Sequence, residues 1–197
     1  MVRHTGIILK RTNPTKSLYS VLDKTEGAIF CSIVRQGICP GACIEYTLQQ
    51  KMTWLVADNV ELVAFPSVNN TADLLLLHRA LEICLVCMPI GSFTPGIFEY
   101  ISILYDTSSM ACLESSLVKK IFLCKLLALL GFYPHEKKFQ NPFFHSLIAQ
   151  SLDNIISFPV SMVQEKDVEE WLQSCIAVHI QEQKLKMRSI GEWVEIV

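Results

Sequence analysis

Residues 118–134, VKKIFLCKLLALLGFYP, are the longest nearly unbroken apolar run in the chain. From the residue before this run onward, apolar residues recur at the spacing of one helical face: Leu117, Ile121, Cys124, Leu127, Ala128 and Leu130. Others cover most of the remaining circumference, and a helix that is apolar nearly all round is buried in a protein core or in lipid. Three lysines argue against lipid: Lys119, Lys120 and Lys125. We therefore expect a central core helix, which Gly131 ends.

The composition is sufficient for a sizeable core, and the charged residues are unevenly distributed along the chain. The chain has 197 residues, 51% apolar and 18% charged, which suits one large or two small domains. The net charge is −2, yet residues 1–51 carry 7 Lys and Arg against 3 acidic residues, and residues 117–138 carry 5 against 1. Residues 52–116 between them carry 1 against 7. The two basic regions are candidates for a binding face.

The N-terminus shows no secretory signal, because it lacks an apolar stretch of the required length and a small-residue cleavage site. The eight cysteines lie mostly in apolar segments, where reduced cysteine behaves as a small hydrophobe: Cys31, Cys39, Cys43, Cys84, Cys87, Cys112, Cys124 and Cys175. We therefore expect reduced thiols in a cytoplasmic protein without a membrane span, rather than a disulfide framework.

The first 65 residues are typical of short strands separated by turns. Apolar or alternating runs occur at residues 6–10, 18–22, 28–34 and 43–52. Two further runs, at residues 54–56 and 60–65, flank Asp58-Asn59 and are either the arms of a hairpin or one long bent strand. Such a segment is too short for a seven-stranded sandwich and suits a small five-stranded barrel.

Residues 66–71, PSVNNT, mark a boundary after which the apolar spacing becomes helical. Helices are expected at 71–88, around 98–105, at 108–114, at 117–130, at 141–152 and from Asp167 onward. We expect a β-barrel in residues 1–68 and helices in residues 69–197, an α+β chain with the strands first.

Four stretches occur in the order and spacing of one known family. They are residues 6–38, residues 80–104 (ALEICLVCMPIGSFTPGIFEYISIL), residues 120–134 (KIFLCKLLALLGFYP) and residues 178–193 (VHIQEQKLKMRSIGEW). Positions in the second stretch that fall on the family pattern are Glu82, Pro95, Phe98 and Leu104. In this order the stretches resemble the bacterial recombination mediator family RecO, and they span nearly the whole chain.

The resemblance implies an N-terminal OB-fold barrel and an all-α helical domain. It further implies a bacterial, nucleoid-associated protein that binds single- and double-stranded DNA and promotes annealing. The implied partners in recombinase loading are RecR and single-stranded-DNA-binding protein, whose acidic C-terminal tail would be captured. Many members insert a zinc module after the signature helix. Here residues 133–141 contain no cysteine, so the chain is similar to a shortened member without zinc.

Nine basic residues are the candidate DNA-binding set: Arg3, Lys10, Arg11, Lys16, Lys24, Arg35, Lys51, Lys186 and Arg188. The barrel residues form either an ordinary solvated face or a groove that tracks phosphates. Aromatic residues within reach as platforms for bases are Tyr19, Phe30, Tyr46 and Trp54, although the apolar strand around Phe30 favours a core position. Lys186 and Arg188 match the family's C-terminal pattern, and reflect either a helix-end charge preference or a contact to nucleic acid or an acidic tail.

Other motifs favour structural roles. Cys84 and Cys87 form a CxxC pair within a helical apolar pattern and without a second pair, so core packing is favoured over a metal site. Cys39 and Cys43 flank the Pro40-Gly41 turn without further ligands, and the same preference applies. The chain contains no GxSxG, P-loop, GxGxxG or HExxH motif. We therefore expect no enzymatic activity, no catalytic residues and neither a metal nor another cofactor.

Two functions remain open. A DNA-binding recombination mediator predicts basic residues that converge on one barrel face and binding that weakens with salt. A protein-interaction adapter with the same fold predicts dispersed barrel charges and an apolar groove among the helices for a partner's tail. The isoelectric point near 6.2 is low for a protein that neutralises many phosphates and favours the adapter.

Overall fold

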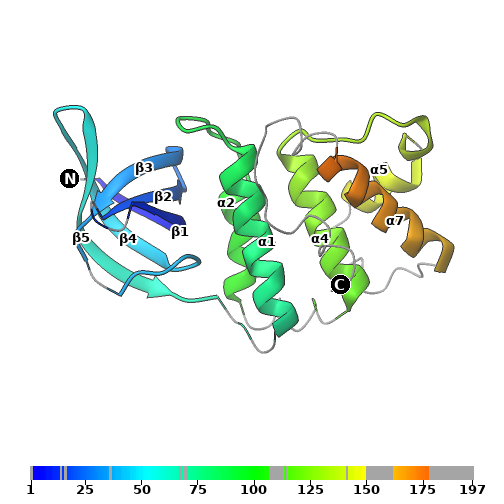
Figure 1. Ribbon diagram of the computed structural model, residues 1–197, viewed down its shortest axis with the longest axis horizontal. Helices are drawn as coiled ribbons and strands as arrows, with labels where there is room; N and C mark the ends of the chain where they lie inside the picture. Colours follow the sequence, from blue (N-terminus) through cyan, green and yellow to red (C-terminus); the bar gives the residue numbers. More distant parts are fainter. Residues whose placement is uncertain are drawn as a thin grey trace. The chain divides into compact units, whose positions relative to one another are not determined.

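The computed structural model describes residues 2–13, 15, 17–35, 37–66, 68, 71–106, 113, 115–140, 142–149 and 162–177. Five strands are followed by helices (Figure 1). The chain divides into two compact units, Met1–Asp106 and Thr107–Val197. The first unit therefore includes two α-helices as well as the strands, whereas the boundary expected from the sequence, after residue 68, marks the change from strands to helices.

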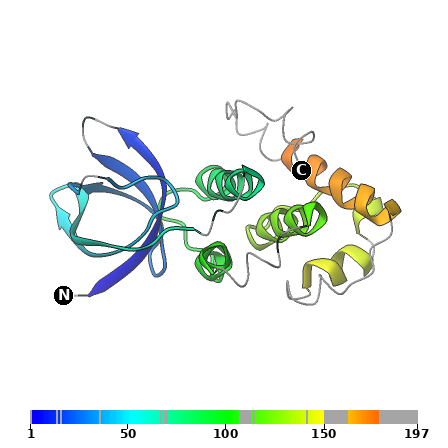
Figure 2. The same ribbon diagram turned by 90° about the horizontal axis from the view of Figure 1, so that it is seen from below.

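The five strands close into a barrel in the order β1-β2-β3-β5-β4, with β4 paired back to β1. Their bounds are β1 Arg3–Asn13, β2 Leu18–Asp23, β3 Gly27–Ile33, β4 Cys43–Lys51 and β5 Trp54–Ala64. β3 and β5 pair in parallel, and the other neighbours are antiparallel. In Figure 2 the strands encircle a common interior. The expected five-stranded barrel is confirmed and is consistent with an OB-like fold.

The region around Asp58 and Asn59 is one long bent strand and not a hairpin. β5 runs without interruption past Asn59, whose φ of 53° is left-handed. The β4–β5 register shifts between Glu45 and Thr47, opposite this position. An extra residue in one strand of an antiparallel pair bends the strand and increases its twist, which helps the sheet to close.

Alternate residues of each strand fill the barrel interior. The buried cluster consists of Ile8, Tyr19, Val21, Ile29, Cys31, Ile33, Ile38, Ala42, Ile44, Tyr46 and Ala57. On β3 the inward residues are therefore the odd-numbered ones. Phe30 points outward and is 39% exposed, so the expectation of a core position is wrong. Both faces of this strand are apolar in sequence, and alternation alone does not decide which one is buried.

Two helices and a short 3₁₀ turn complete the first unit: α1 Thr71–Cys87, α2 Ile97–Ser102 and η1 Ile103–Tyr105. Cys84 and Cys87 are buried in α1, which confirms that they pack in the core. The Tyr105 hydroxyl donates a 2.7 Å hydrogen bond to the Gly41 carbonyl before β4. This contact ties the end of the helical segment to the barrel.

The connection from α1 to α2 docks on the edge of β3. The Ala28 N–H donates to the Ser92 carbonyl at 2.9 Å, and the Gly91 N–H donates to the Ala28 carbonyl at 2.7 Å. β5 pairs with β3 only from Cys31 onward, so this segment takes the part of the edge that β5 leaves open. A Cβ on Gly27 would lie 2.0 Å from the Ser92 oxygen, which explains a glycine there.

The described elements of the second unit are helical: α4 Ser116–Leu129, η2 Lys137–Phe139, α5 Pro142–Ala149 and α7 Met162–Cys175. α4 is buried from Val118 to Ala128, as expected for the core helix. It ends at Gly131, whose φ is 85° and whose N–H donates to the Ala128 carbonyl at 2.9 Å. The positive φ and the hydrogen bond are those of a glycine C-cap.

α7 packs on α4 through the side chains Val168, Trp171, Leu172 and Cys175, all buried. The helix begins at Met162, five residues before the predicted start. α5 begins as predicted and ends at Ala149; residues 150–152 lie outside the described part, as does nearly all of the predicted helix at 108–114. Among the described residues, no helix is both long and apolar enough to cross a membrane.

Candidate functional site

The predicted basic residues of the barrel differ in their partners. Arg3 lies between two carboxylates, 3.4 Å from that of Glu45 and 2.7 Å from that of Glu61. The Lys24 ammonium is 3.7 Å from Glu99. All three pairs are solvent-exposed, and exposed ion pairs contribute only about 0–1 kcal/mol. Their cations can therefore exchange a carboxylate for another anion at little cost.

Arg35 and Arg11 each contact a group that is not acidic. The Arg35 guanidinium donates to the Val60 carbonyl of β5 at 2.5 Å. The Arg11 guanidinium lies 5.7 Å from the centre of the Tyr19 ring, within cation–π range. Three residues of the predicted set lie outside the described residues: Lys16, Lys186 and Arg188. Their role in binding DNA stays a prediction.

A row of outward-facing residues crosses the barrel at one level. Lys10 of β1 is opposite Ser20 of β2, which in turn is opposite Phe30 of β3. Phe30 and Trp54 immediately precede the paired residues Cys31 and Leu55 of the parallel strands. Trp54 is opposite Lys51 of β4. We call Lys10, Ser20, Phe30, Trp54 and Lys51 the transverse row.

The transverse row places two exposed aromatic residues between two exposed lysines. Phe30 is 39% and Trp54 is 57% exposed. Lys51 lies 3.5 Å from Asp58, in a pair that is largely open to solvent. The positive charge of Lys10 lowers the pKa of Glu82 on α1. Burial of Glu82 has the larger effect, so the net pKa is raised. With neighbouring strands about 4.8 Å apart, the row spans five strand positions.

Ser20 is the buried member of the row. It is 1% exposed, and among the described residues its hydroxyl has no hydrogen-bond partner. An unpaired buried hydroxyl costs about 1–3 kcal/mol, so the position is unfavourable for folding alone. The row therefore contains a polar group that the described part of the protein leaves unsatisfied.

Two of the aromatic residues expected to be platforms are inside the barrel. Tyr19 and Tyr46 are 3% and 0% exposed, so neither ring can stack on a base. The sequence does not separate them from Trp54, because tyrosine is common both in strand cores and at exposed binding faces. Their burial reduces the predicted platforms to Phe30 and Trp54.

Tyr46 belongs to a buried polar cluster at one end of the barrel. Its hydroxyl donates to the Asp23 carboxylate, which also accepts from the Thr25 N–H and hydroxyl and from the Glu26 N–H, each at 2.8 Å. His4 Nδ1 lies 3.3 Å from the same carboxylate, and its ring stacks 5.7 Å from that of Tyr46. Both carboxylate oxygens of Asp23 therefore accept hydrogen bonds within the fold.

The hydrogen bonds set the ionisation of this cluster. Burial raises the pKa of Asp23, but the hydrogen bonds from Tyr46, Glu26 and Thr25 together outweigh it, and the net pKa lies below the ordinary value. Burial, and then the Asp23 charge, raise the pKa of Tyr46. Asp23 is thus ionised and Tyr46 neutral at physiological pH, as a structural charge–dipole contact requires.

The second basic region does not form an exposed basic face on α4. Lys119, Lys120 and Lys125 are 6%, 7% and 5% exposed. Lys120 lies 3.5 Å from Glu169 of α7, while burial lowers the pKa of Lys125 to about 8. The expectation of a binding face in residues 117–138 is therefore wrong for these three lysines, because a helix buried around its circumference has no solvent side for them. Lys137 and Lys138 of the same region are exposed.

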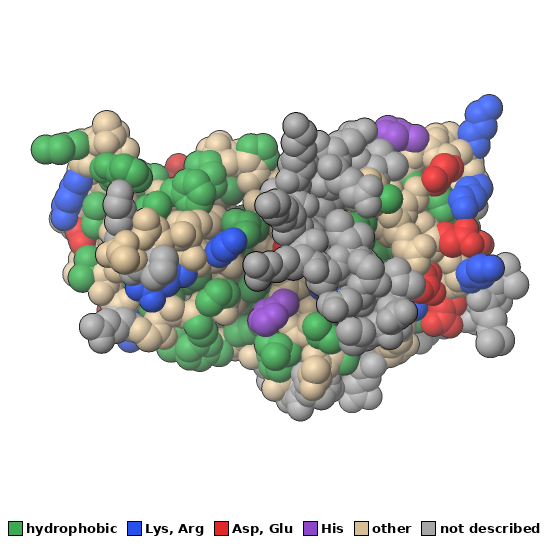
Figure 3. All heavy atoms as spheres, viewed as in Figure 1, with side chains coloured by type: hydrophobic (Ala, Val, Ile, Leu, Met, Phe, Trp, Pro, Cys, Tyr) green, Lys and Arg blue, Asp and Glu red, His purple; other side chains and the backbone are tan. Residues whose placement is uncertain are grey.

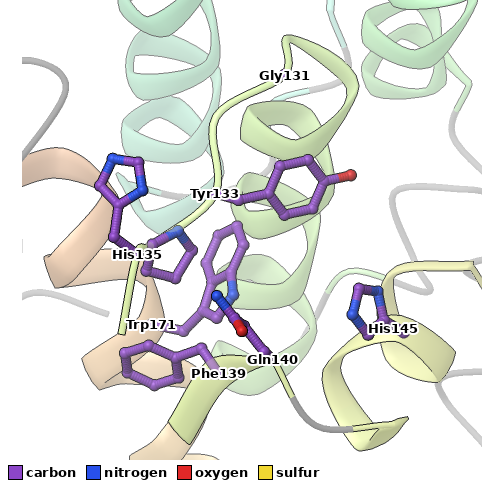
Figure 4. A pocket seen from close by; sticks show the side chains of 8 residues that line it. Gly131, Tyr133, His135, Phe139, Gln140, His145 and Trp171 are labelled. Carbon is purple, nitrogen blue, oxygen red and sulfur yellow. The ribbon is translucent and has the colours of Figure 1, made fainter. Parts of the chain in front are cut away.

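The second unit contains a pocket of about 260 Å³ (Figure 4). Its lining comes from η2, α5, α7 and the segment after α4: Gly131, Tyr133, Pro134, His135, Phe139, Gln140, His145 and Trp171. The Tyr133 and Trp171 rings meet edge to face with centres 6.4 Å apart. In Figure 4 the Trp171 indole lies between Tyr133 and Phe139, and His145 faces the group from α5.

The pocket combines aromatic walls with imidazole and amide groups at its edge. Trp171 and Phe139 are buried, whereas His135, Gln140 and His145 are exposed. Such a lining suits an apolar or aromatic group that carries a polar end. Within the described ranges no three His, Cys, Asp or Glu side chains are arranged to hold a metal ion.

Figure 3 shows how side chains of each kind are distributed on one face. Hydrophobic side chains are spread over the part formed by the barrel unit, and its lysines and arginines are scattered between them.

No family model matches the sequence. No curated protein matches it either.

Proposed function

We propose that the protein is a non-enzymatic, RecO-like recombination mediator. It binds single- and double-stranded DNA, promotes annealing and helps to load recombinase together with RecR and single-stranded-DNA-binding protein during DNA repair in a bacterial cytoplasm. The proposal includes an OB-fold barrel and an all-α helical domain. The observation that carries its DNA-binding part is the transverse row, with Phe30 and Trp54 between Lys10 and Lys51 on a closed five-stranded barrel. The partners and the roles in annealing and recombinase loading are what the family resemblance implies.

The row fits single-stranded nucleic acid chemically. Bases stack on exposed aromatic rings irrespective of sequence, and each such contact contributes about 1–3 kcal/mol. Lysines on both sides of Phe30 and Trp54 can neutralise phosphates of a strand that crosses the row. In OB-folds the face of the second and third strands and the loop between the last two strands bind oligonucleotides. Phe30 lies on β3, and Trp54 follows the β4–β5 turn.

A protein-interaction adapter with the same fold is the second candidate. Two observations favour it: Arg3, Lys24 and Lys51 face carboxylates, and Arg35 is used within the barrel. The pocket around Trp171 offers a place for an aromatic residue at the end of a partner's acidic tail. The mediator also requires capture of such a tail, so the pocket alone does not separate the two candidates.

DNA binding by the full-length protein separates them. Fluorescence anisotropy with an oligothymidine would be measured from low to physiological salt for the wild type, Phe30→Ala, Trp54→Ala and Lys10→Glu/Lys51→Glu. Phe65→Ala is the matched control, because Phe65 is 50% exposed but lies outside the row. Lys166→Glu controls for charge, because Lys166 is an exposed lysine on α7.

For the mediator we expect each aromatic variant to lose affinity about 5- to 150-fold, while Phe65→Ala stays near the wild type. The double lysine variant should lose most of its affinity at low salt, and Lys166→Glu should not. Wild-type protein that fails to bind even at low salt would exclude direct DNA handling. Binding of an acidic, aromatic-ended peptide that is lost in Tyr133→Ala would then support the adapter.

A further inference from the structure

The connection between α1 and α2 brings additional exposed apolar residues to the edge of β3. Ile90 and Phe93 are 49% and 53% exposed. They flank Gly91 and Ser92, whose backbone groups bond to Ala28. Phe93 lies so close to the strand that a Cβ on Gly27 would be 2.8 Å from its Cα. Ala28 faces outward two residues before Phe30, about 7 Å along the strand.

The backbone of this segment is held in place on both sides. Besides the two hydrogen bonds to Ala28, the Ser92 hydroxyl and N–H both donate to the Pro89 carbonyl, at 2.6 and 2.9 Å. Gly91 has a φ of 82°, which residues that carry a side chain rarely adopt. Phe93 therefore follows a backbone that four hydrogen bonds hold in place.

A lysine also lies close in the sequence to Gly27, where the α1–α2 connection docks on β3. Lys24 lies in the β2–β3 turn, three residues before Gly27. Its side chain is 53% exposed, and its ammonium lies 3.7 Å from the Glu99 carboxylate and 5.8 Å from the centre of the Phe98 ring. Trp54 is opposite Lys51, Ser20 lies between Phe30 and Lys10, and Lys24 precedes Gly27, the glycine closest to Phe93. Aromatic residues and cations thus repeat along the barrel surface.

We propose that Phe93 is a third base-stacking platform, which extends the site for single-stranded DNA from the transverse row onto the α1–α2 connection. The inference rests on the proposed function, because it lengthens the same site. Lys24 neutralises phosphate next to Phe93 by exchanging its weak pair with Glu99. A strand that covers Trp54 and Phe30 only does not reach Phe93, whereas a longer strand does.

The test is the length dependence of binding by the full-length protein. Oligothymidines of increasing length would be titrated by anisotropy into the wild type, Phe93→Ala, Phe93→Trp and Phe65→Ala. Phe65 is the matched control because its exposure, 50%, is close to that of Phe93. Thermal unfolding of each variant verifies that the fold is kept.

We expect Phe93→Ala to bind the shortest oligomers like the wild type and to lose about 5- to 150-fold with longer ones. Phe93→Trp should restore the gain with length, because any flat aromatic ring can stack. If Phe93→Ala matches Phe65→Ala at every length while Trp54→Ala and Phe30→Ala lose affinity, the third platform is excluded and the proposed function stands. If neither Trp54→Ala nor Phe30→Ala loses affinity, both the third platform and the proposed function are excluded.

Discussion

The Tyr46 hydroxyl of β4 donates a hydrogen bond to the Asp23 carboxylate at the end of β2, inside the barrel. The two residues belong to strands that do not pair with each other, since β1 lies between them. His4 of β1 completes the link, 3.3 Å from the same carboxylate. The cluster therefore joins three consecutive strands at the end where the β2–β3 turn begins.

Asp23→Asn is expected to lower the free energy of unfolding by about 1–3 kcal/mol near neutral pH, because a buried charged acceptor with several donors is lost. The pKa of Asp23 is lowered in the folded protein, so its contribution is present above the unfolded value of 3.8. It is lost as the pH falls through the folded value. Urea unfolding of both proteins at pH 7, 5 and 3 measures this, and a difference that does not shrink toward pH 3 would contradict it.

Gly27→Ala is expected to destabilise the first unit by about 2–4 kcal/mol. The φ of 76° is strained for alanine, and the new Cβ would lie 2.0 Å from the Ser92 oxygen. Gly37→Ala is the matched control, because its φ of 78° is similar while nothing lies within 4 Å of its Cβ. It should cost only about 1 kcal/mol. Equal losses in urea unfolding would mean that the contact with Ser92 is unimportant.

The order of strands and helices was predictable from the sequence, because apolar residues are spaced differently in the two. Apolar spacing changes from two to about 3.6 residues after residue 66, and the structure changes from strands to helices there. The core helix at α4 and its stop at Gly131 follow from the apolar spacing of residues 117–130 and from the glycine after them. These features depend on local patterns, which need no knowledge of distant contacts.

The candidate site was less predictable, because it depends on which face of each strand is buried. β3 is apolar on both faces, so the outward position of Phe30 is decided only by barrel closure. The docking of residues 91–92 on Ala28 joins segments more than 60 residues apart and leaves no local pattern. The burial of the α4 lysines depends likewise on packing with other elements.

Lys125→Met is expected to stabilise the protein by about 2–3 kcal/mol at pH 7. Burial lowers the lysine pKa to about 8 from 10.5, so protonation favours the unfolded state. The free-energy cost of burying the charged lysine is fully present below pH 8 and decreases as the pH rises toward 10.5. Chemical unfolding from pH 7 to 10 should show the advantage of the variant decreasing. Lys166→Met, on an exposed position of α7, should give no such trend.

Lys10→Ala and Lys51→Ala should each reduce the salt dependence of DNA binding. For single strands the slope of log affinity against log salt is about −0.7 per neutralised phosphate, so each variant should be less steep by about 0.7. Anisotropy titrations at four or more salt concentrations measure the slope. Lys166→Ala should keep the wild-type slope, and unchanged slopes in the first two variants would exclude phosphate contacts at the row.

Cys39 is expected to react with a thiol reagent in the native protein much faster than the buried cysteines. It is exposed, whereas Cys31, Cys84 and Cys87 are buried, and burial raises the pKa of each of these three thiols. Reaction requires an accessible thiolate. Stopped-flow labelling of the wild type and Cys39→Ser tests this, and a fast phase that persists in the variant at full amplitude would contradict it.

The pairing of β1 with β4 has a consequence for synthesis on the ribosome. Arg3 pairs with Thr47, which is made 44 residues later. At about 5–20 residues per second, the first strand waits about 2–9 s for this partner. During that interval one edge of the nascent strand is open to pairing with other chains. A charged residue on an open edge discourages such association, and Arg3 places a charge on this edge.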